Sequence, residues 1–394
     1  MRILGIIAEY DPFHLGHARH LRLAREAVRP DYTYAVLSGC FKQRGEPALL
    51  SPYDRAACAL AAGADAVFAL PAVWTVRDAE HYALGGVSLL MKLGATHLAF
   101  GAETDHPDSL RRVAERMEHP GADFQIRLKS HLASGCGYPR ALQLAAAEEN
   151  PEDALLLEKP NNILAICYLR AIRRLEAELE PVLIPRHGAY HADRIDAREP
   201  SASAIRDSLL RGNYGEAYEA VTGESAQILR KAFLGRQIPD PKCLDALLIQ
   251  RLRRSTKEEL RRLPDLSEGL EDRLAEAAGA VNTRGELLDA VSTRRYPRAR
   301  ISRICTASLL DMTREQLDRE PLPEQAVLLG LRKHPGMTAL WREKQDLISR
   351  EWRHETDLLA WKTWALCAGL PDTLPRSERV IVYPPSGPAS GEDG

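Results

Sequence analysis

Short, continuous apolar runs alternate with helical patterns through the first half of this 394-residue chain. Runs of this kind predict strands covered on both faces, as in an α/β fold with a Rossmann-like parallel sheet. Helices are expected at His17 to Val28 and at Pro52 to Ala62, where Ser51 and Pro52 form a typical helix start. The expected strands are Ile3 to Ala8, Tyr34 to Ser38, Ala66 to Leu70, His97 to Phe100 and Val182 to Pro185.

The pattern changes near residue 238. Strand-like runs disappear there, and Leu, Ala, Arg and Glu recur at helical spacing to about residue 370. We therefore expect an α/β domain over 1–237 and a mainly helical domain over 238–383. The run Val380 to Tyr383 favours a late strand, and the Pro, Ser and Gly content of 384–394 predicts a disordered tail.

The composition is that of an ordinary globular protein, with 45% hydrophobic and 27% charged residues. The net charge of −2 gives no global sign of nucleic-acid binding, so such binding would use a local patch. Seven scattered cysteines argue against a disulfide framework and a zinc site, and they favour a reducing cytoplasm. No secretory signal or membrane segment is expected, because Asp65 and Pro71 interrupt the long apolar stretch Ala56 to Trp74.

The stretch Gly5 to His17 carries the most chemistry. A buried strand leads through an Asp-Pro turn to His14 and His17, whose three-residue spacing puts them on one face of a starting helix. A helix start offers free N–H groups and partial positive charge to a phosphate, and Gly16 leaves room for a ligand. We interpret this as a nucleotide site in which two imidazoles contact a triphosphate. A metal site or plain surface histidines are the alternatives.

Polar segments follow three other expected elements. Lys42 and Arg44 lie in the loop after the second strand, where they suit phosphate or carboxylate; the alternative is a solvated basic loop. Gly101 ends the fourth strand, either to admit a base or ribose or as a simple turn glycine. Asn161 and Asn162 open a helix, as ligands or as caps. Ligands of open parallel sheets bind at the carboxyl ends of the strands, so these segments should meet His14 and His17.

Two further segments come after the fifth strand. Arg186 and His187 lie directly beyond it, and Ser201 to Arg206 has the pattern of a helix start whose hydroxyls and N–H groups face an anion. An ordinary serine cap with a surface arginine is the alternative. Together with the histidine turn, this segment favours phosphate binding.

An arginine-rich segment, residues 292–303, lies in the expected helical half. It contains five arginines, one tyrosine and no acidic residue. Arginine contacts phosphate and stacks on bases, and tyrosine stacks as well, which favours RNA over a merely solvated basic face. The candidate RNA-binding residues are Arg294, Arg295, Tyr296, Arg298, Arg300 and Arg303.

The His-x-Gly-His turn and the later Ser-x-Ser-x-Ile-Arg segment resemble the HIGH-type nucleotidylyl transferase superfamily. More narrowly, the chain resembles the bacterial tRNA(Met) cytidine acetate ligase family. The resemblance covers about residues 5 to 303. It rests on Glu9 to His17, Ser38 to Pro47, Gly63 to Asp65, Phe100-Gly101, Lys159 to Leu164 and the arginine-rich segment.

The resemblance implies that acetate and ATP form acetyl-adenylate, and that the acetyl group then passes to N4 of the wobble cytidine of elongator tRNA(Met). Mg²⁺ is expected with ATP, and acetate and tRNA are the expected partners. The expected catalytic residues are His14, His17, Lys42, Arg44 and Arg206. The expected ATP-binding residues are Ile7, Ala8, Glu9, Tyr10, Pro12, Phe13, His14, Gly16, His17, Gly101, Asn162, Arg186, His187 and Ser203.

The chain departs from the family pattern at four positions. Asp11 and Cys40 stand where Asn is expected, Lys42 where an apolar residue is expected, and Ala102 where Ser is expected. Two other functions remain open: a small-molecule adenylyltransferase of the same superfamily, and a non-catalytic RNA-binding protein that retains a nucleotide fold. The first gives no use for the arginine-rich segment, and the second predicts no ATP turnover.

Overall fold

The computed structural model describes residues 1–186, 195, 200–267, 269–371 and 380–384. The predicted ATP-binding residue His187 and the predicted disordered tail, from residue 385 on, lie outside the described residues. None of the described helices is both long and apolar enough to cross a membrane.

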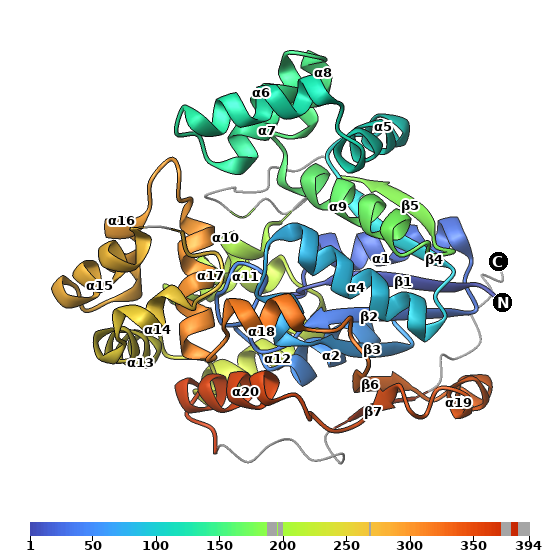
Figure 1. The fold of residues 1–394 in the computed structure, drawn as a ribbon. Helices are drawn as coiled ribbons and strands as arrows, with labels where there is room; N and C mark the ends of the chain where they lie inside the picture. The colour runs from blue at the N-terminus through green and yellow to red at the C-terminus, as the bar shows by residue number, and fades with distance from the viewer. Residues whose placement is uncertain (187–194, 196–199, 268, 372–379, 385–394) are drawn as a thin grey trace.

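The chain forms one mostly parallel sheet with strand order β5-β4-β1-β2-β3-β6-β7, and β8 pairs with β6 (Figure 1). The first five strands are parallel to their neighbours, whereas β6 runs antiparallel to β3. The strands are β1 Ile3–Ala8, β2 Tyr32–Ser38, β3 Ala66–Leu70, β4 His97–Ala102, β5 Glu180–Pro185, β6 Ala326–Arg332, β7 Ile348–Ser349 and β8 Ile381–Tyr383. The predicted α/β fold class, all five early strands and the late strand are confirmed.

The expectation that no strand lies between residues 238 and 370 is wrong at β6 and β7. The run Ala326–Arg332 is short and apolar, and such a run fits a buried strand as well as a buried helix. It pairs with β3, whose other neighbour is β2, so the chain returns to complete the sheet on that side. The exact boundary between domains at residue 237 stays a prediction.

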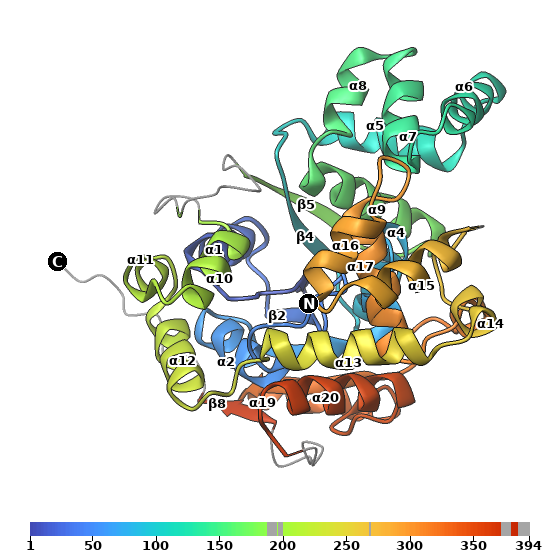
Figure 2. The ribbon, with the colours of Figure 1, turned by 90° about the vertical axis from the view of Figure 1, so that its left-hand side faces the viewer.

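Helices cover both faces of the sheet. Figure 2 shows α4 and α9 on one side of the strands and α1 and α2 on the other. The first helices are α1 Leu15–Val28, α2 Pro52–Ala61, α3 Ala72–Thr75, α4 Ala79–Leu93, α5 Pro107–Glu118, α6 Ala122–Ala133, α7 Tyr138–Ala147, α8 Pro151–Leu156, α9 Pro160–Arg174, α10 Ala202–Leu210, α11 Tyr214–Glu219 and α12 Gly223–Leu234. The cap predicted for α2 is confirmed, because Ser51 Oγ accepts a hydrogen bond from the Asp54 N–H.

The later helices are α13 Pro241–Arg254, α14 Lys257–Arg261, α15 Leu270–Ala280, α16 Arg284–Val291, α17 Arg298–Leu309, α18 Arg314–Arg319, α19 Pro335–Arg342 and α20 Glu355–Cys367. Apolar side chains between residues 248 and 305 form a small core of their own. From residue 307 on, apolar side chains join the main core around the sheet. Helices α6 to α8 form a separate lobe at the top of Figure 1, and α13 to α17 lie at its left.

Candidate functional site

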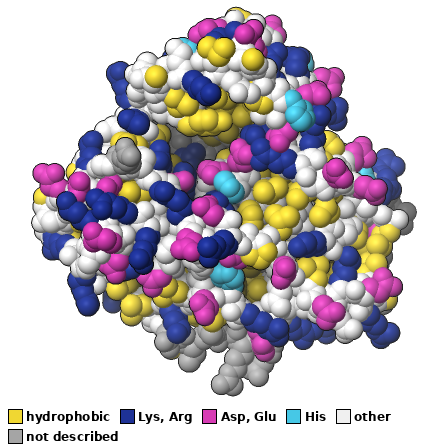
Figure 3. Space-filling view, in the orientation of Figure 1, with side chains coloured by type: hydrophobic (Ala, Val, Ile, Leu, Met, Phe, Trp, Pro, Cys, Tyr) yellow, Lys and Arg dark blue, Asp and Glu magenta, His cyan; other side chains and the backbone are white. Residues whose placement is uncertain are grey.

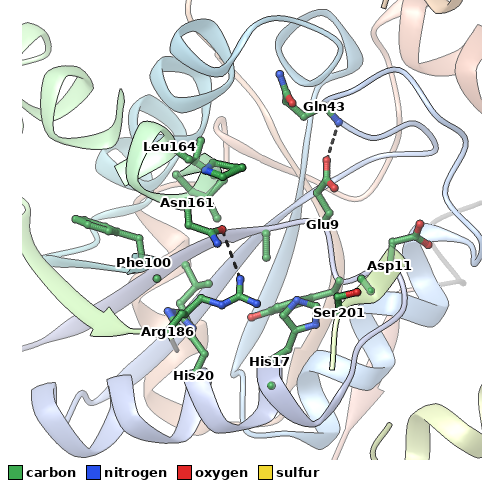
Figure 4. Close-up of a pocket in the computed structure, with 18 of the residues that line it drawn as sticks. Glu9, Asp11, His17, His20, Gln43, Phe100, Asn161, Leu164, Arg186 and Ser201 are labelled. Atoms are coloured by element: carbon green, nitrogen blue, oxygen red, sulfur yellow. Dashed lines mark hydrogen bonds between the residues drawn. The ribbon is translucent and has the colours of Figure 1, made fainter. Parts of the chain in front are cut away.

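A cavity of about 550 Å³ opens at the carboxyl ends of β1, β4 and β5. It is lined by the turn between β1 and α1, the loop after β2, the start of α9 and the start of α10. Its volume is within the range of sites that bind small molecules and cofactors. Figure 4 shows His17, His20 and Arg186 on one side of it, with Glu9 and Gln43 on another. The predicted convergence of strand-end segments is thus present in the structure.

Helix α1 begins with the two histidines in a reciprocal cap. His14 is the N-cap residue, and its Nδ1 accepts a hydrogen bond from the Gly16 backbone N–H at 3.1 Å. His17 Nδ1 accepts from the backbone N–H of His14 at 3.4 Å. A neutral imidazole has one N–H, so an accepting Nδ1 puts the proton of each ring on Nε2. Each ring therefore has one N–H donor that the helix itself does not use.

Both imidazoles are neutral in this cavity. Burial lowers the pKa of His14 to about 3, and the nearby Arg186 charge adds to the effect. Burial, His14 and Arg186 hold the pKa of His17 well below its usual range. His20, three residues further along α1, has its pKa lowered to about 4, mainly by burial. The histidines are thus neutral donors, and positive charge has to come from other side chains.

A charged cluster of Asp11, Lys42, Glu46 and Arg206 forms the wall beside the histidines. Lys42 Nζ lies 2.7 Å from Glu46 Oε2 and 3.3 Å from Asp11 Oδ2. Arg206, one turn into α10, donates to the Asp11 carbonyl oxygen at 2.6 Å, and its Nη2 lies 3.7 Å from Glu46 Oε2.

Both acids of the charged cluster are ionised. Burial raises the pKa of Asp11, but the charges of Lys42, Arg206 and Arg55 outweigh it and hold that pKa below its usual range. Burial also acts against ionisation of Glu46, and Lys42 and Arg206 nevertheless bring its pKa to about 2. Asp11 and Lys42 are almost fully buried, whereas 42% of the Glu46 side chain is exposed. Glu46 is therefore the member that an incoming anion can displace most easily.

The start of α9 closes the opposite side of the cavity. Asn162 is buried, and its Oδ1 accepts hydrogen bonds from the N–H groups of Glu103 and Thr104 at 2.8 and 3.3 Å. Neither asparagine side chain caps α9. Asn161 rather than Asn162 lines the cavity, and Arg186 Nη1 lies 3.5 Å from Asn161 Oδ1 (Figure 4). Asn162 thus joins the end of β4 to the start of α9.

Most of the predicted ATP-site residues line the cavity. Pro12, Phe13 and Asn162 are the described exceptions, and all three are buried. Phe13 supports the histidine turn, because its ring packs against Tyr10 and His17 at centroid distances of 4.7 and 5.7 Å. The predicted residues that line it are Ile7, Ala8, Glu9, Tyr10, His14, Gly16, His17, Lys42, Arg44, Gly101, Arg186, Ser203 and Arg206.

Several residues of the cavity are not predicted from the sequence. His20 continues the three-residue spacing of His14 and His17, and this spacing was the available signal. The others lie on hydrophobic helix faces or next to predicted residues, and include Gln43, Tyr82, Leu164 and Tyr168. Gly101 has a second role, because a Cβ there would lie 2.7 Å from Arg186 Cδ. A side chain at this position would push Arg186 aside.

The arginine-rich segment does not line the cavity. Arg294 and Arg295 are exposed in the loop before α17, and Arg295 and Arg300 lie against the Tyr296 ring. Arg298 pairs with Asp289. Arg300 Nε donates to the Asp265 carbonyl oxygen at 2.8 Å, and Arg303 Nε lies 3.2 Å from Asp265 Oδ2. The loop arginines, Arg294 and Arg295, are therefore the best placed of the five for an external anion.

Comparison with known proteins places these features in context. The model of the HIGH Nucleotidyl Transferase family matches residues 1–355. A tRNA(Met) cytidine acetate ligase of Fervidobacterium nodosum is 34% identical over 84% of this chain and 79% of its own length. One of Syntrophotalea carbinolica is 38% identical, over 79% of this chain and 75% of its own.

The fold is also similar to a solved structure. The crystal structure of Thermotoga maritima TmcAL bound with alpha-thio ATP superposes with a TM-score of 0.87 at 26% sequence identity. The match covers 98% of this chain and 100% of that one, so it includes the cavity and the later helices.

Proposed function

The chain belongs to the tRNA(Met) cytidine acetate ligase family of HIGH nucleotidyl transferases, and we propose that it carries out the two reactions of such a ligase. In the first, ATP and acetate form acetyl-adenylate and pyrophosphate. In the second, the acetyl group passes to N4 of the wobble cytidine of elongator tRNA(Met), and AMP is released. The observation that carries this proposal is the pair of capping histidines at the carboxyl end of β1, each with an Nε2–H that the helix start does not use.

The first reaction needs charge stabilisation more than acid–base chemistry. An acetate oxygen attacks the α-phosphorus, and the bond from that phosphorus to the bridging oxygen of pyrophosphate breaks. Negative charge then spreads over the phosphoryl oxygens. Neutral Nε2–H donors of His14 and His17 stabilise that charge without being reorganised during the step. Arg186 and Arg206, which also line the cavity, supply positive charge.

Mg²⁺ with ATP stays a prediction. The described residues contain no group of three or more His, Cys, Asp or Glu side chains placed to hold a metal ion. Asp11 and Glu46, the carboxylates of the charged cluster, already pair with Lys42 and Arg206. We therefore propose that Mg²⁺ enters on the oxygens of ATP, in keeping with its preference for phosphate and water, and we assign it no protein site.

The second reaction joins two substrates of different size. The cytidine N4 amine attacks the acetyl carbonyl carbon, the bond to the AMP oxygen breaks, and the amine loses one proton. An amine conjugated with a base is a weak nucleophile, so prior activation of acetate is chemically reasonable. A cytidine in an anticodon loop can leave its stack and enter a pocket. We propose that the loop arginines hold the tRNA backbone while it does so.

One assay tests the function. The protein is incubated with ATP, labelled acetate and bulk tRNA, and the label in RNA is counted. We expect labelling that requires ATP, and pyrophosphate release that requires acetate. Transfer of AMP to a small molecule without labelled RNA would instead support a small-molecule adenylyltransferase. RNA binding without ATP turnover would support a non-catalytic RNA-binding protein.

Charge reversal at Arg294 and Arg295 tests the RNA surface. Figure 3 shows a hollow between the lobe of α6 to α8 and the body of the protein, with Lys and Arg side chains nearby. In the variant Arg294→Glu/Arg295→Glu we expect tRNA affinity to fall by at least about ten-fold. The salt dependence, as the slope of log affinity against log salt, should become shallower by about 2. Filter binding at several salt concentrations measures both.

The matched control is Arg342→Glu/Arg350→Glu, which makes the same change of charge at exposed arginines near α19 and β7. In Figure 1 these elements lie far from α17. We expect the control to bind tRNA nearly as the wild type does. Equal losses in the two variants would show that only total charge matters and would remove the loop arginines as the RNA surface.

A further inference from the structure

The loop after β2 touches helix α17 at one tight turn, formed by Arg44 and Gly45. Ser302 Oγ donates a hydrogen bond to the Arg44 carbonyl oxygen, and Thr306 Oγ1 donates to the Gly45 carbonyl oxygen. Arg284, the first residue of α16, donates from Nη2 to the same Gly45 oxygen at 3.1 Å and also to Ser302 Oγ. Three side chains from two helices thus hold two consecutive carbonyls of this turn.

Gly45 lies in close contact with the backbone of α17. Gly45 has a φ of +74°, a conformation that favours glycine. A Cβ at this position would lie 2.7 Å from the Ser302 carbonyl oxygen and 2.9 Å from Arg303 Cα. Both of these are backbone atoms, so they cannot turn aside as a flexible side chain can. Any larger residue here would have to move the turn away from α17.

The same turn also fixes the positions of Lys42 and Glu46, two members of the charged cluster. The Gly45 N–H donates to the Lys42 carbonyl oxygen at 2.9 Å, and the Lys42 N–H donates to the Glu46 carbonyl oxygen at 2.8 Å. Lys42 and Glu46 are also joined through their side chains, and Glu46 reaches Arg206 on α10. A shift of the Gly45 carbonyl therefore moves the lysine and the carboxylate that flank the histidines.

We propose that Arg284, Ser302 and Thr306 are positioning residues for the adenylation reaction, acting through the Arg44-Gly45 turn on the charged cluster. This inference rests on the proposed function. None of the three lines the cavity, so they act through the turn, and the charge of Arg284 also adds to those that lower the pKa of Glu46. They hold Lys42 and Glu46 in the geometry in which the triphosphate of ATP can exchange for the Glu46 carboxylate. The helical part of the chain is thus needed for the first reaction as well as for RNA.

Thr306→Val tests the proposal, because valine has the size of threonine but lacks the hydroxyl donor. The Gly45 carbonyl still receives a bond from Arg284, so the fold should be kept. The readout is acetate-dependent exchange of labelled pyrophosphate into ATP. We expect the KM for ATP to rise about ten-fold, the equivalent of one good hydrogen bond. Thr306→Ser keeps the hydroxyl and should have the wild-type KM for ATP. The affinity for tRNA should be unchanged in both variants.

Two further variants sharpen the test. Gly45→Ala displaces the turn from its other side and should raise the KM for ATP at least as much. Ser308→Ala removes a buried hydroxyl from the same helix but outside the contact with the turn, and should leave that KM unchanged. A merely structural role would reduce the active fraction, which lowers the apparent kcat without moving KM.

The proposal is overturned if Thr306→Val and Gly45→Ala both keep the KM for ATP within about two-fold of wild type, whatever happens to kcat. Should Gly45→Ala fail to fold, Ser302→Ala takes its place with the same readout. Failure of the proposed function looks different, because the wild-type protein would then show no acetate-dependent exchange at all.

Discussion

His17→Asn is expected to slow acetyl-adenylate formation by about 10²–10³-fold, the usual cost of removing one preorganised donor from a charge-stabilising site. The asparagine Oδ1 can stand where Nδ1 stands and still accept from the His14 N–H, so the start of α1 should be kept. What is lost is the Nε2–H donor toward the phosphate. Acetate-dependent pyrophosphate exchange measures the rate, and circular dichroism checks the fold.

A second substitution at the same position distinguishes the contribution of the N–H donor from that of the imidazole ring. In His17→Gln the longer side chain can bring its amide N–H close to the position of Nε2, so we expect a loss about ten-fold smaller than in the asparagine variant. His106→Asn, at an exposed histidine before α5, serves as the control and should exchange at the wild-type rate. If the asparagine variant exchanged as fast as wild type, His17 would have no part in adenylation.

The part of the site that could be predicted is the part that is local in sequence. The β1 strand, the turn and the histidine pair all lie between residues 3 and 17, and their apolarity and spacing are visible without any knowledge of the fold. The strand-end rule then placed Lys42, Gly101 and Arg186 at the same cavity. The helix predicted from His17 begins two residues earlier, at Leu15, and His14 is its N-cap, because its Nδ1 accepts a hydrogen bond from the Gly16 N–H.

The rest depends on contacts between distant residues. Strand β6 lies in a region rich in helices, and its strand character comes from pairing with β3, more than 250 residues earlier. Prolines at 321, 323 and 335 bound this run and were an available signal. Likewise, Asp265 engages Arg300 and Arg303, and Asp289 pairs with Arg298, so three of the five arginines have a partner that segment composition does not reveal. The hydrogen bond from Thr306 of α17 to the Gly45 carbonyl oxygen is equally non-local.

Lys42→Met is expected to lower the free energy of unfolding by about 3 kcal/mol, because it leaves a buried carboxylate without its nearest cation. Asp11 is 1% exposed, and its Oδ2 lies 3.3 Å from Lys42 Nζ and 3.6 Å from Arg206 Nη1. Its Oδ1 accepts from the Leu49 N–H at 2.7 Å, so the side chain is fixed and cannot turn to water. Arg206 remains in Lys42→Met, which keeps the expected cost near the lower end for such pairs.

The double variant Asp11→Asn/Lys42→Met removes both charges and restores the residue types that the family pattern implies at these positions. An amide oxygen still accepts from Leu49, so most of the lost stability should return, giving a coupling energy of about 2 kcal/mol in urea unfolding. The KM for ATP should nevertheless stay about ten-fold above wild type, because the triphosphate has lost one of the cations that flank the histidines. If the double variant had the wild-type KM for ATP, the role of Lys42 would be limited to neutralising Asp11, without a contribution to ATP binding. Independent, additive losses of stability would mean that the two residues are not coupled, and the charged cluster would then have to be explained by Glu46 and Arg206 alone.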